Sequence, residues 1–344
     1  MKKLKIGVIG TGKMGLLHAG IFNALEKSEL FAISEKKKII SIFLKKYLSG
    51  VNIYQNYKEM LENEDLDIVV ITTPVFLHKG MIIDAMEYNL NIFVEKPLAI
   101  SGDECRMILS NKYENKTMVG YCRRFMGTYN YAKKIIENSN LGKINYFRSQ
   151  LFVAQVFNQG RGWLYDPKIS GGGVLMDLGS HAIDLFHYLF GDIETVHAFG
   201  ESLFNKEVED YVSANFKFKN VLQGSLELSW SVKNYRLPEL KIEIHFDEGV
   251  IIVTEKYVSI YSEKEIDFIK KGWNTHYKQS LTKDIPVNLG GSEYTLEDLH
   301  LLNCILENKN TLCDFKEATK TNLVIDKIYS SIQKERVERI DYTV

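Results

Sequence analysis

The feature that most constrains the fold is a glycine-rich loop that directly follows an apolar strand pattern and opens a helical pattern. The loop consists of Gly10, Thr11, Gly12, Lys13, Met14 and Gly15. Gly10 permits a tight turn, Gly12 lets the backbone approach a pyrophosphate, and Gly15 lets the helix pack on the strand. The helix start offers free N–H groups and a positive dipole end to phosphates. In this strand-to-helix context the loop predicts a dinucleotide-binding site rather than a chance glycine turn.

The first ~120 residues alternate short β-branched runs with amphipathic helical patterns, which is typical of βαβ units and a parallel sheet. The predicted strands are Lys5–Gly10, Leu30–Ser34, Val51–Tyr54, Asp67–Thr73, Asn91–Glu95 and Thr117–Cys122. The run Ile68–Ile71 is apolar without alternation, as expected for a strand covered by helices on both faces.

After Leu141 and Gly142 the pattern changes to long alternating strands with little helix between them. The predicted strands here are Lys143–Val153, Thr195–Glu201, Tyr211–Phe218, Val221–Trp230, Leu240–Phe246 and Gly249–Thr254, and the predicted helices are Val174–Phe190, Thr295–Glu307 and Ala318–Lys334. The sequence therefore predicts an α/β fold class with an N-terminal Rossmann dinucleotide-binding domain over residues 1–122. A C-terminal α+β domain over residues 123–344, with a large and mainly antiparallel sheet, is expected to bind substrate and to mediate oligomerisation.

Composition favours a small-molecule partner. The chain has 344 residues, and its 43 Lys and Arg nearly balance its 44 Asp and Glu, so charge gives no reason to expect nucleic acid or an anionic membrane. No apolar run approaches the ~20 residues of a membrane span. The four cysteines show no CxxC spacing, which indicates core thiols in a reducing compartment, and we expect a cytoplasmic protein.

Cofactor choice depends on the end of the second strand. Glu35 lies twenty residues beyond Gly15, where a carboxylate can accept hydrogen bonds from the adenosine ribose. It would repel a 2′-phosphate, which favours NAD, while Ser34 and Lys36 soften that repulsion and keep NADP as the alternative.

Further candidate contacts to the cofactor end the fourth and fifth strands, because ligands of open α/β sheets bind at the carboxyl edge. At the fourth strand these are Thr72, Thr73 and Pro74, followed by His78, which is either a ligand contact or a packing residue.

The fifth strand ends in Glu95, Lys96 and Pro97. Proline stops the strand, and a sharp turn there would aim Lys96 into a cleft. The alternative from these residues alone is a simple ion pair of Glu95 and Lys96 at the strand end.

A second constellation follows three glycines at 171–173. Asp177, His181 and Asp184 are expected on one face of a helix whose other face is apolar. A histidine beside a carboxylate is a tuned acid/base with a fixed tautomer. The alternatives are a stabilising pair on a helix surface, or half of a metal site with His187 or Asp184; no third ligand is well placed, so no metal is expected.

These motifs, in this order, resemble the glucose-fructose oxidoreductase, inositol dehydrogenase and rhizopine-catabolism (Gfo/Idh/MocA) family. The similarity rests on the glycine loop, Thr72–Pro74 with His78, Glu95–Pro97, the segments 118–125 and 141–144, and the helix from Gly171 to Asp184. It implies nicotinamide-dependent hydride transfer to or from a hydroxyl or carbonyl of a sugar, cyclitol or sugar derivative.

By matching motif positions, the resemblance implies that Lys96 orients and polarises the reacting oxygen, His181 exchanges its proton, and Asp177 contacts the substrate. The further candidates for substrate contacts are Tyr121, Arg123, Arg161, Trp163 and Arg236. Two alternatives stay open: a nucleotide-sugar dehydrogenase or ketosugar reductase of glycan or antibiotic-sugar biosynthesis, and a non-catalytic sensor of NAD(H) or sugar.

Assembly is expected through the second domain. Its long sheet should carry one uncovered face rich in aromatic side chains, especially in Tyr211–Phe218 and Val221–Trp230. Large apolar patches usually find a partner, so we expect a homodimer or homotetramer joined through these sheets.

Overall fold

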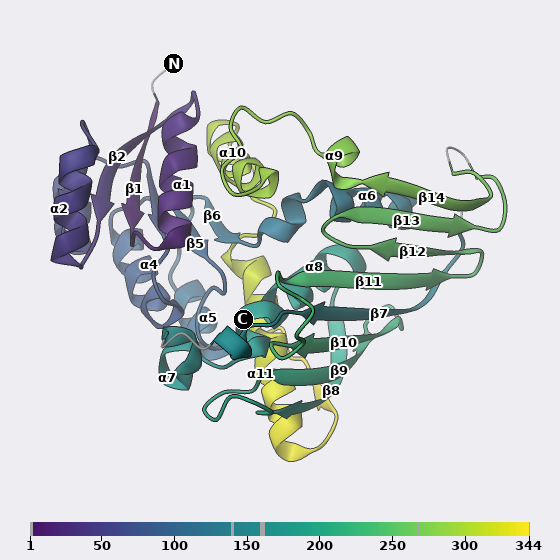
Figure 1. Ribbon diagram of the computed structural model, residues 1–344. Coiled ribbons are helices and arrows are strands. Elements are labelled where there is room, and N and C mark those ends of the chain that lie inside the picture. Colours follow the sequence, from purple (N-terminus) through teal and green to yellow (C-terminus); the bar gives the residue numbers. More distant parts are fainter. Residues whose placement is uncertain (1–2, 139–140, 159–161, 267–268, 344) are drawn as a thin grey trace. The chain divides into compact units, whose positions relative to one another are not determined.

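The chain forms two compact units. The computed structural model describes residues 3–138, 141–158, 162–266 and 269–343 (Figure 1). The first unit comprises the residues up to Cys122 together with Asp284–Thr319, and the second comprises Arg123–Lys283 with Lys320–Thr343. The structure therefore differs from the expected second domain running unbroken over residues 123–344.

The segment after Lys283 returns to the first unit because it binds along an open sheet edge. The N–H of Val119 donates to the carbonyl of Cys313 at 2.9 Å, and the hydroxyl of Thr311 donates to the carbonyl of Thr117 at 2.6 Å. Edge strands carry unpaired backbone groups that need partners. The returning segment supplies them from a distant part of the chain.

The first unit is built on a parallel six-stranded sheet of order β3-β2-β1-β4-β5-β6. Its strands are β1 (Leu4–Ile9), β2 (Ser28–Ser34), β3 (Asn52–Tyr54), β4 (Ile68–Ile71), β5 (Asn91–Glu95) and β6 (Thr117–Gly120). All four residues of β4 are buried, as expected for a central strand. This strand order is that of the Rossmann fold and confirms the predicted fold class of this part.

Helices connect and cover these strands. They are α1 (Lys13–Ala24), α2 (Lys38–Tyr47), α3 (Tyr57–Asn63), the short helix η1 (Val75–Leu77), α4 (His78–Glu87), α5 (Gly102–Leu109) and, from the returning segment, α10 (Ser292–Leu306). The four cysteines, all within the described residues, are buried and form no disulfide. The helix α11 (Phe315–Lys334) begins in the first unit and continues in the second.

The second unit contains a nine-stranded sheet of order β14-β13-β12-β11-β7-β10-β9-β8-β15, in which β7 and β10 pair in parallel and the other neighbours are antiparallel. The strands are β7 (Ile144–Phe152), β8 (Ile193–Glu201), β9 (Tyr211–Phe218), β10 (Gln223–Ser229), β11 (Glu239–Phe246), β12 (Gly249–Val253), β13 (Tyr257–Ser262), β14 (Gly272–Tyr277) and β15 (Glu338–Arg339). The mainly antiparallel sheet confirms the prediction for the C-terminal part.

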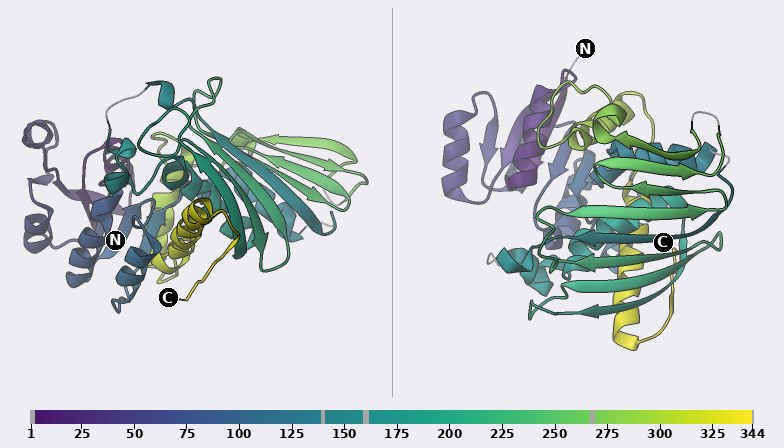
Figure 2. Two further views of the ribbon diagram at one scale, coloured as in Figure 1. Left: turned by 90° about the horizontal axis from the view of Figure 1, so that it is seen from below. Right: turned by 45° about the vertical axis from the view of Figure 1, so that its right-hand side comes forward.

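The other elements of the second unit are helical. They are η2 (Cys122–Phe125, which starts at the unit boundary), α6 (Gly127–Asn138), η3 (Val156–Asn158), η4 (Trp163–Tyr165), α7 (Pro167–Ser170), the π-helix η5 (Leu175–Gly179), α8 (Ser180–Phe190) and α9 (Lys278–Leu281). In the right-hand view of Figure 2, α11 passes behind the strands of the nine-stranded sheet. Apolar residues of α8 and α11 join the core on that face.

The open face of this sheet corrects the expected location of the exposed aromatic residues. Phe216, Phe218 and Trp230 are buried in the core, because alternate residues of a strand point to opposite faces. Apart from Tyr211 at the start of β9, the outward positions of β9 and β10 are polar, as at Lys217 and Glu227.

The aromatic side chains of the open face lie on other strands. Register pairing places Tyr146, His245, Val250, Tyr261 and Trp273 in one row across β7, β11, β12, β13 and β14. The rings of Tyr146 and His245 stack at 4.4 Å, and those of Tyr261 and Trp273 lie 5.5 Å apart. We call these five residues the aromatic row.

Candidate active site

The glycine loop of the first unit has the backbone shape that a dinucleotide requires. Gly10 has φ of +92°, which favours glycine. Gly12 is exposed, and a Cβ at this position would meet nothing within 4 Å, so the backbone is open to a ligand. At Gly15 a Cβ would lie 2.1 Å from the carbonyl oxygen of Gly10, so only glycine lets α1 pack here. No side chain caps the start of α1, which leaves it suited to phosphate.

Glu35 lies beside this loop. Its Oε2 accepts a hydrogen bond from the N–H of Thr11 at 3.2 Å and another from the Thr11 hydroxyl, and its Oε1 accepts from the N–H of Lys37 at 2.7 Å. Lys13 is exposed and Met14 is half-buried. The carboxylate thus joins the end of β2 to the loop that would hold the pyrophosphate.

The residues after β4 are tied to the same loop. The hydroxyl of Thr72 donates to the carbonyl of Gly10 at 3.0 Å, and Thr73 and Pro74 follow half-buried. His78 is buried, with Nε2 2.9 Å from the carbonyl of Thr73 and Nδ1 3.0 Å from that of Pro97. Burial lowers the pKa of His78, although these carbonyls oppose the shift. His78 therefore links the turn after β4 to the turn after β5.

Lys96 follows the end of β5 and is half-buried. Its N–H donates to Oε2 of Glu95 at 3.2 Å, and the Lys96–Pro97 peptide is cis. The other oxygen of Glu95 lies 2.9 Å from Nε2 of His18. The predicted cofactor residues and Lys96 thus gather at the carboxyl edge of the six-stranded sheet. Tyr121, just after β6, is buried.

In the second unit, the helix with the predicted acid/base pair is almost wholly buried. From Gly172 to Phe190, the side chains that keep partial exposure are those of Asp177, His181 and Tyr188. The expected single helix consists of a π-turn that contains Asp177, followed by α8, which contains His181. Single π-turns occur often at functional sites.

Asp184 does not share this partly exposed face, which corrects the expectation of three polar residues on one side. It is fully buried and accepts two hydrogen bonds from Arg124, at 2.8 and 2.9 Å. A buried carboxylate needs such a partner. Asp184 is therefore a structural ion-pair residue.

The glycines before this helix serve packing inside the unit. A Cβ at Gly172 would lie 1.9 Å from the hydroxyl of Tyr329, and one at Gly173 would lie 2.0 Å from the carbonyl of Glu209. The Glu209 carboxylate accepts from the N–H of Gly173 at 2.9 Å, from that of Leu175 at 3.1 Å and from the Tyr329 hydroxyl at 2.9 Å. Burial raises the pKa of Glu209, while these donors oppose the shift. Glu209 and Tyr329 together hold the start of the helix.

The remaining candidates for substrate contacts differ in how far they are buried. Arg123 is buried and donates from Nε and Nη2 to Glu255 at 3.2 and 3.1 Å. Trp163 and Arg236 are exposed. Arg161 lies outside the described residues.

Known protein families match the sequences of both units. Residues 4–121 match a family described as an oxidoreductase family with an NAD-binding Rossmann fold, and residues 129–252 match the GFO/IDH/MocA C-terminal domain. The chain belongs to the GFO/IDH/MocA oxidoreductase family. The resemblance noted from the motifs is confirmed, and with it the assignment as an oxidoreductase with NAD as cofactor.

Relatives that resemble this chain along most of its length include two named dehydrogenases. The chain is 26% identical over 331 residues to scyllo-inositol 2-dehydrogenase (NAD(+)) of Bacillus subtilis, covering 92% of this chain and 90% of that protein. It is 24% identical over 384 residues to levoglucosan dehydrogenase of Pseudarthrobacter phenanthrenivorans, covering 97% of each. A solved structure of levoglucosan dehydrogenase in complex with NADH and levoglucosan shares the fold, with a TM-score of 0.90 at 23% identity over 99% of this chain and 100% of that one.

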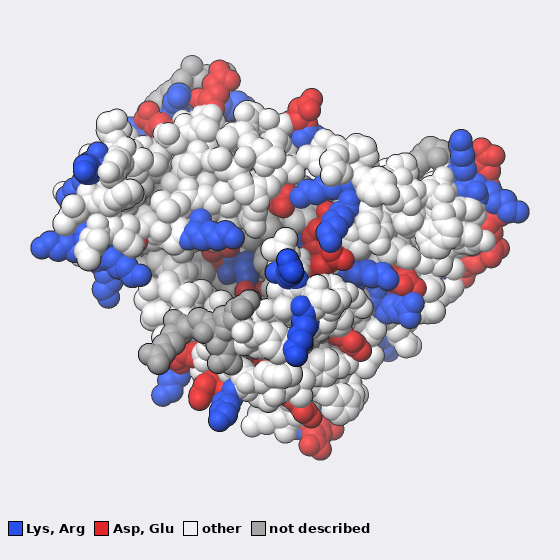
Figure 3. All heavy atoms as spheres, in the orientation of Figure 1, with Lys and Arg blue, Asp and Glu red and all other residues white. Residues whose placement is uncertain are grey.

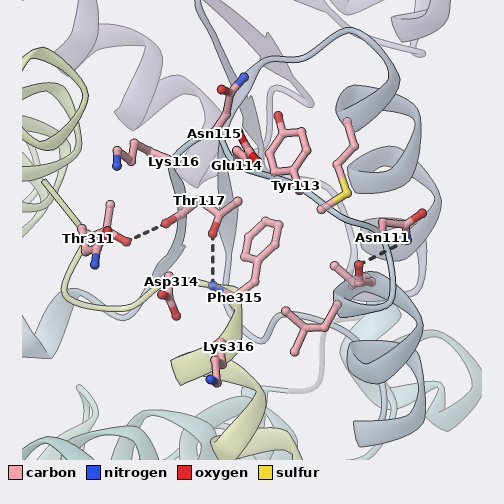
Figure 4. A pocket seen from close by; sticks show the side chains of 14 residues that line it. Asn111, Tyr113, Glu114, Asn115, Lys116, Thr117, Thr311, Asp314, Phe315 and Lys316 are labelled. Carbon is pink, nitrogen blue, oxygen red and sulfur yellow. Dashed lines mark hydrogen bonds between the residues drawn. The ribbon is translucent and has the colours of Figure 1, made fainter. Parts of the chain in front are cut away.

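A cavity of about 270 Å³ in the first unit lies away from this cofactor edge (Figure 4). Its lining includes Tyr113, Lys116 and Thr117, which precede or begin β6, and Asp314 and Phe315 of the returning segment. Thr117 starts its strand, so the cavity is at the amino end of a parallel sheet whose ligands bind at the carboxyl end. It is not part of the family's candidate active site.

Basic and acidic side chains are both spread over the face shown in Figure 3. Within residues 3–138, 141–158, 162–266 and 269–343, no helix is long and apolar enough to cross a membrane.

Proposed function

We propose that this protein is an NAD-dependent dehydrogenase that interconverts a hydroxyl and a carbonyl on a sugar or cyclitol. The observation that carries the proposal is the half-buried pair Asp177 and His181 on an otherwise buried helix. An aspartate and a histidine four positions apart that both keep partial exposure on a largely buried helix are candidates for acid/base chemistry. Family membership and relatives named for inositol and levoglucosan support the substrate class.

The dinucleotide is held by the loop Gly10–Gly15, with Glu35 toward the adenosine ribose and the segments Thr72–Pro74 and Glu95–Lys96 toward the nicotinamide. The open backbone at Gly12 and the uncapped start of α1 support this assignment. When bound, the nicotinamide supplies hydride transfer, and the protein supplies orientation and charge.

By their positions in the family's motifs, three side chains are proposed to handle the reacting hydroxyl. Lys96 donates a hydrogen bond that orients the hydroxyl oxygen and stabilises the negative charge that this oxygen gains as its proton leaves. His181 takes the hydroxyl proton and returns it in the reverse direction. Asp177 binds a neighbouring hydroxyl and keeps the substrate in register. Among the other candidates, Tyr121, Arg123, Arg161 and Trp163 are proposed to contact the substrate.

The proposal is tested by scanning a substrate panel at the absorbance band of reduced nicotinamide. The panel holds scyllo-inositol, myo-inositol, levoglucosan, simple sugars, and UDP- and dTDP-sugars, each with NAD and with NADP. We expect turnover on a free sugar or cyclitol with NAD, and at least tenfold tighter binding of NADH than of NADPH because Glu35 repels a 2′-phosphate. Turnover confined to nucleotide-sugars would favour the biosynthetic alternative, and NADH binding without turnover on any panel member would favour a sensor.

We further propose that the protein is a homodimer, or a dimer of dimers, joined through the open face of the nine-stranded sheet. The aromatic row supports this, because Tyr146 is 48% and Trp273 is 58% exposed on that face. Contiguous exposed aromatic side chains on a soluble protein usually mark a contact surface.

A further inference from the structure

Three buried ionisable side chains of the first unit form a continuous chain that ends at Lys96. Nδ1 of His18 lies 2.9 and 3.0 Å from the two carboxylate oxygens of Asp298, and Nε2 lies 2.9 Å from Oε1 of Glu95. His18 and Asp298 are fully buried, and the Glu95 side chain is 13% exposed. The three residues come from α1, α10 and the end of β5, so they meet only in the folded unit.

The geometry defines the protonation of His18. Each ring nitrogen faces a carboxylate oxygen, and a nitrogen without a proton would set its lone pair against those of an ionised carboxylate. With Asp298 and Glu95 ionised, both nitrogens donate and the imidazole is cationic. Burial alone lowers the pKa of His18, but Asp298 and Glu95 outweigh it and raise the pKa well above its usual value.

The groups around His18 are mostly acidic. Besides Asp298 and Glu95, Glu297 of α10 belongs to the same buried cluster, and the ring of Tyr294, also from α10, lies 6.4 Å from that of His18. Burial raises the pKa of Asp298, while His18 opposes that shift. The cationic imidazole is thus the group that offsets a buried negative cluster.

Glu95 connects this cluster to the candidate catalytic lysine. One of its oxygens accepts from His18, and the other accepts from the backbone N–H of Lys96 at 3.2 Å. A carboxylate held at both oxygens has a fixed position. The backbone that carries Lys96 is therefore held to α1 and α10 through Glu95.

We propose that His18 and Asp298 are positioning residues that act through Glu95 to hold Lys96 at the reacting hydroxyl. The inference rests on the proposed function, in which Lys96 orients that oxygen. The chain of hydrogen bonds fixes the lysine in place, and misplacement by about 1 Å can cost 10²-fold in rate. No substrate contact is required of His18 or Asp298.

His18 and Asp298, with Glu297, are also spaced closely enough to hold a metal ion. The experiment must therefore distinguish a metal site from the proposed chain of hydrogen bonds. Ligand atoms of His18, Glu297 and Asp298 lie within 4.8 Å of one another. A metal would need a bare imidazole nitrogen, whereas both nitrogens are within hydrogen-bonding distance of carboxylates. The proposed protonated histidine and a metal-bound histidine therefore exclude each other.

The test uses His18→Gln and Asp298→Asn, with His300→Gln as the matched control on α10. His300 is a half-buried histidine of the same helix as Asp298, and its Nε2 accepts from the N–H of Leu312 at 2.9 Å. We expect His18→Gln and Asp298→Asn to lower kcat by roughly 10- to 100-fold and to shift the pH profile of kcat/KM. The Kd of NADH should change less than kcat, because the loop Gly10–Gly15 supplies the pyrophosphate contacts. His300→Gln should alter none of these.

A double-mutant cycle identifies the route of the effect. If His18 acts through Lys96, the double variant His18→Gln/Lys96→Ala should turn over no more slowly than Lys96→Ala alone. Additive losses would overturn the proposal, and so would normal kcat and pH profile in a folded Asp298→Asn variant, which remains available if His18→Gln fails to fold. Lys96→Ala with full activity would instead overturn the proposed function.

Direct measurement of His18 supplies a readout independent of turnover. Nitrogen-15 NMR, assigned with Asp298→Asn and His18→Gln, should show both ring nitrogens protonated at pH 8 in the wild-type protein. A neutral ring, or a stoichiometric metal that is lost in His18→Gln, would overturn the proposal.

Discussion

Single residues of the candidate active site differ in how far they are buried. His78 and Asp184 are buried and hydrogen-bonded within their own units. Asp177 and His181 keep partial exposure on a largely buried helix. The proposed proton transfer therefore falls to His181, and the best experiment removes its side chain while leaving the helix intact.

His181→Asn should lower kcat by about 10²- to 10⁴-fold, because general acid/base help is lost, and should leave dinucleotide binding nearly intact. Asp177→Asn keeps the shape and removes the charge, so it should mainly raise KM for the sugar. Steady-state kinetics and NADH fluorescence titration measure both effects.

Tyr188→Phe is the control on the same helix, since it removes only a hydrogen bond to Asn130. Near wild-type turnover in His181→Asn would assign the proton transfer to another group.

The buried His18 predicts a pH-dependent contribution to stability. The pKa of His18 is raised in the folded protein, against about 6.5 in an unfolded chain. Its contribution is therefore fully present below about pH 6.5 and is lost as the pH rises through the folded value. His18→Gln, which leaves a buried carboxylate without its partner, should cost roughly 3–5 kcal/mol at pH 6.

That cost should shrink as the pH rises toward 10, and urea unfolding of both proteins across this range measures it. His300→Gln again serves as the control. Burial lowers the pKa of His300, so its contribution to stability should not fall with rising pH in the same way. A cost of His18→Gln that grows with pH would show that the imidazole is neutral in the folded protein.

At the scale of elements, glycines serve two different purposes, which are access for a ligand and close packing of a helix. In the first unit, Gly12 keeps the backbone open to a ligand, whereas Gly15 lets α1 approach the carbonyl of Gly10. In the second unit, Gly172 and Gly173 make room for Tyr329 and Glu209, which hold the start of the helix that contains Asp177. Packing within the unit therefore explains this second set of glycines.

Gly12→Ala and Gly15→Ala should separate binding from folding. Gly12 has φ of −65° and open space around it, so its variant should fold with an unchanged Tm while the new methyl group weakens NADH binding. Gly15→Ala meets a carbonyl oxygen and should destabilise the first unit by roughly 1–3 kcal/mol. Thermal unfolding and NADH titration of both variants measure the difference. Equal effects of the two substitutions on Tm would contradict the assignment of Gly12 to the ligand.

At the scale of the whole molecule, the nine-stranded sheet has one face covered by helices and one face that bears the aromatic row. The row includes Val250 and Tyr261 from strands next to the sheet's β14 end. Burying such a row in a second copy would remove it from water, which is the physical basis of the proposed dimer.

Trp273→Glu should weaken the dimer by placing a charge in the proposed contact. Light scattering at micromolar concentration should report a dimer or tetramer for the wild-type protein and a smaller species for the variant. Gln223→Glu, on the polar part of the same face, is the control for the added charge alone. A wild-type monomer, or a variant assembly identical to the wild type, would contradict the proposed interface.

Local patterns were sufficient for much of this protein. The glycine loop, the alternation of strands and helices, and the order of the motifs predicted the Rossmann fold, the family and NAD as cofactor, because each is written in neighbouring residues. The strand β14 was missed because it lacks such a local pattern. Its residues alternate between half-buried and exposed, so it has no apolar face that would produce a period of two.

Contacts between distant residues could not be read in this way. Asp298 meets His18 across 280 positions, and Glu209 meets Tyr329 across 120. No local pattern encodes either contact, because each depends on how separate elements pack. The same holds for Asp184. Its spacing in the sequence predicted that it shares a helix face with His181, whereas in the folded unit it pairs with Arg124. Periodicity describes which face a residue occupies, whereas its partner, and therefore its charge and role, is set by what packs against that face.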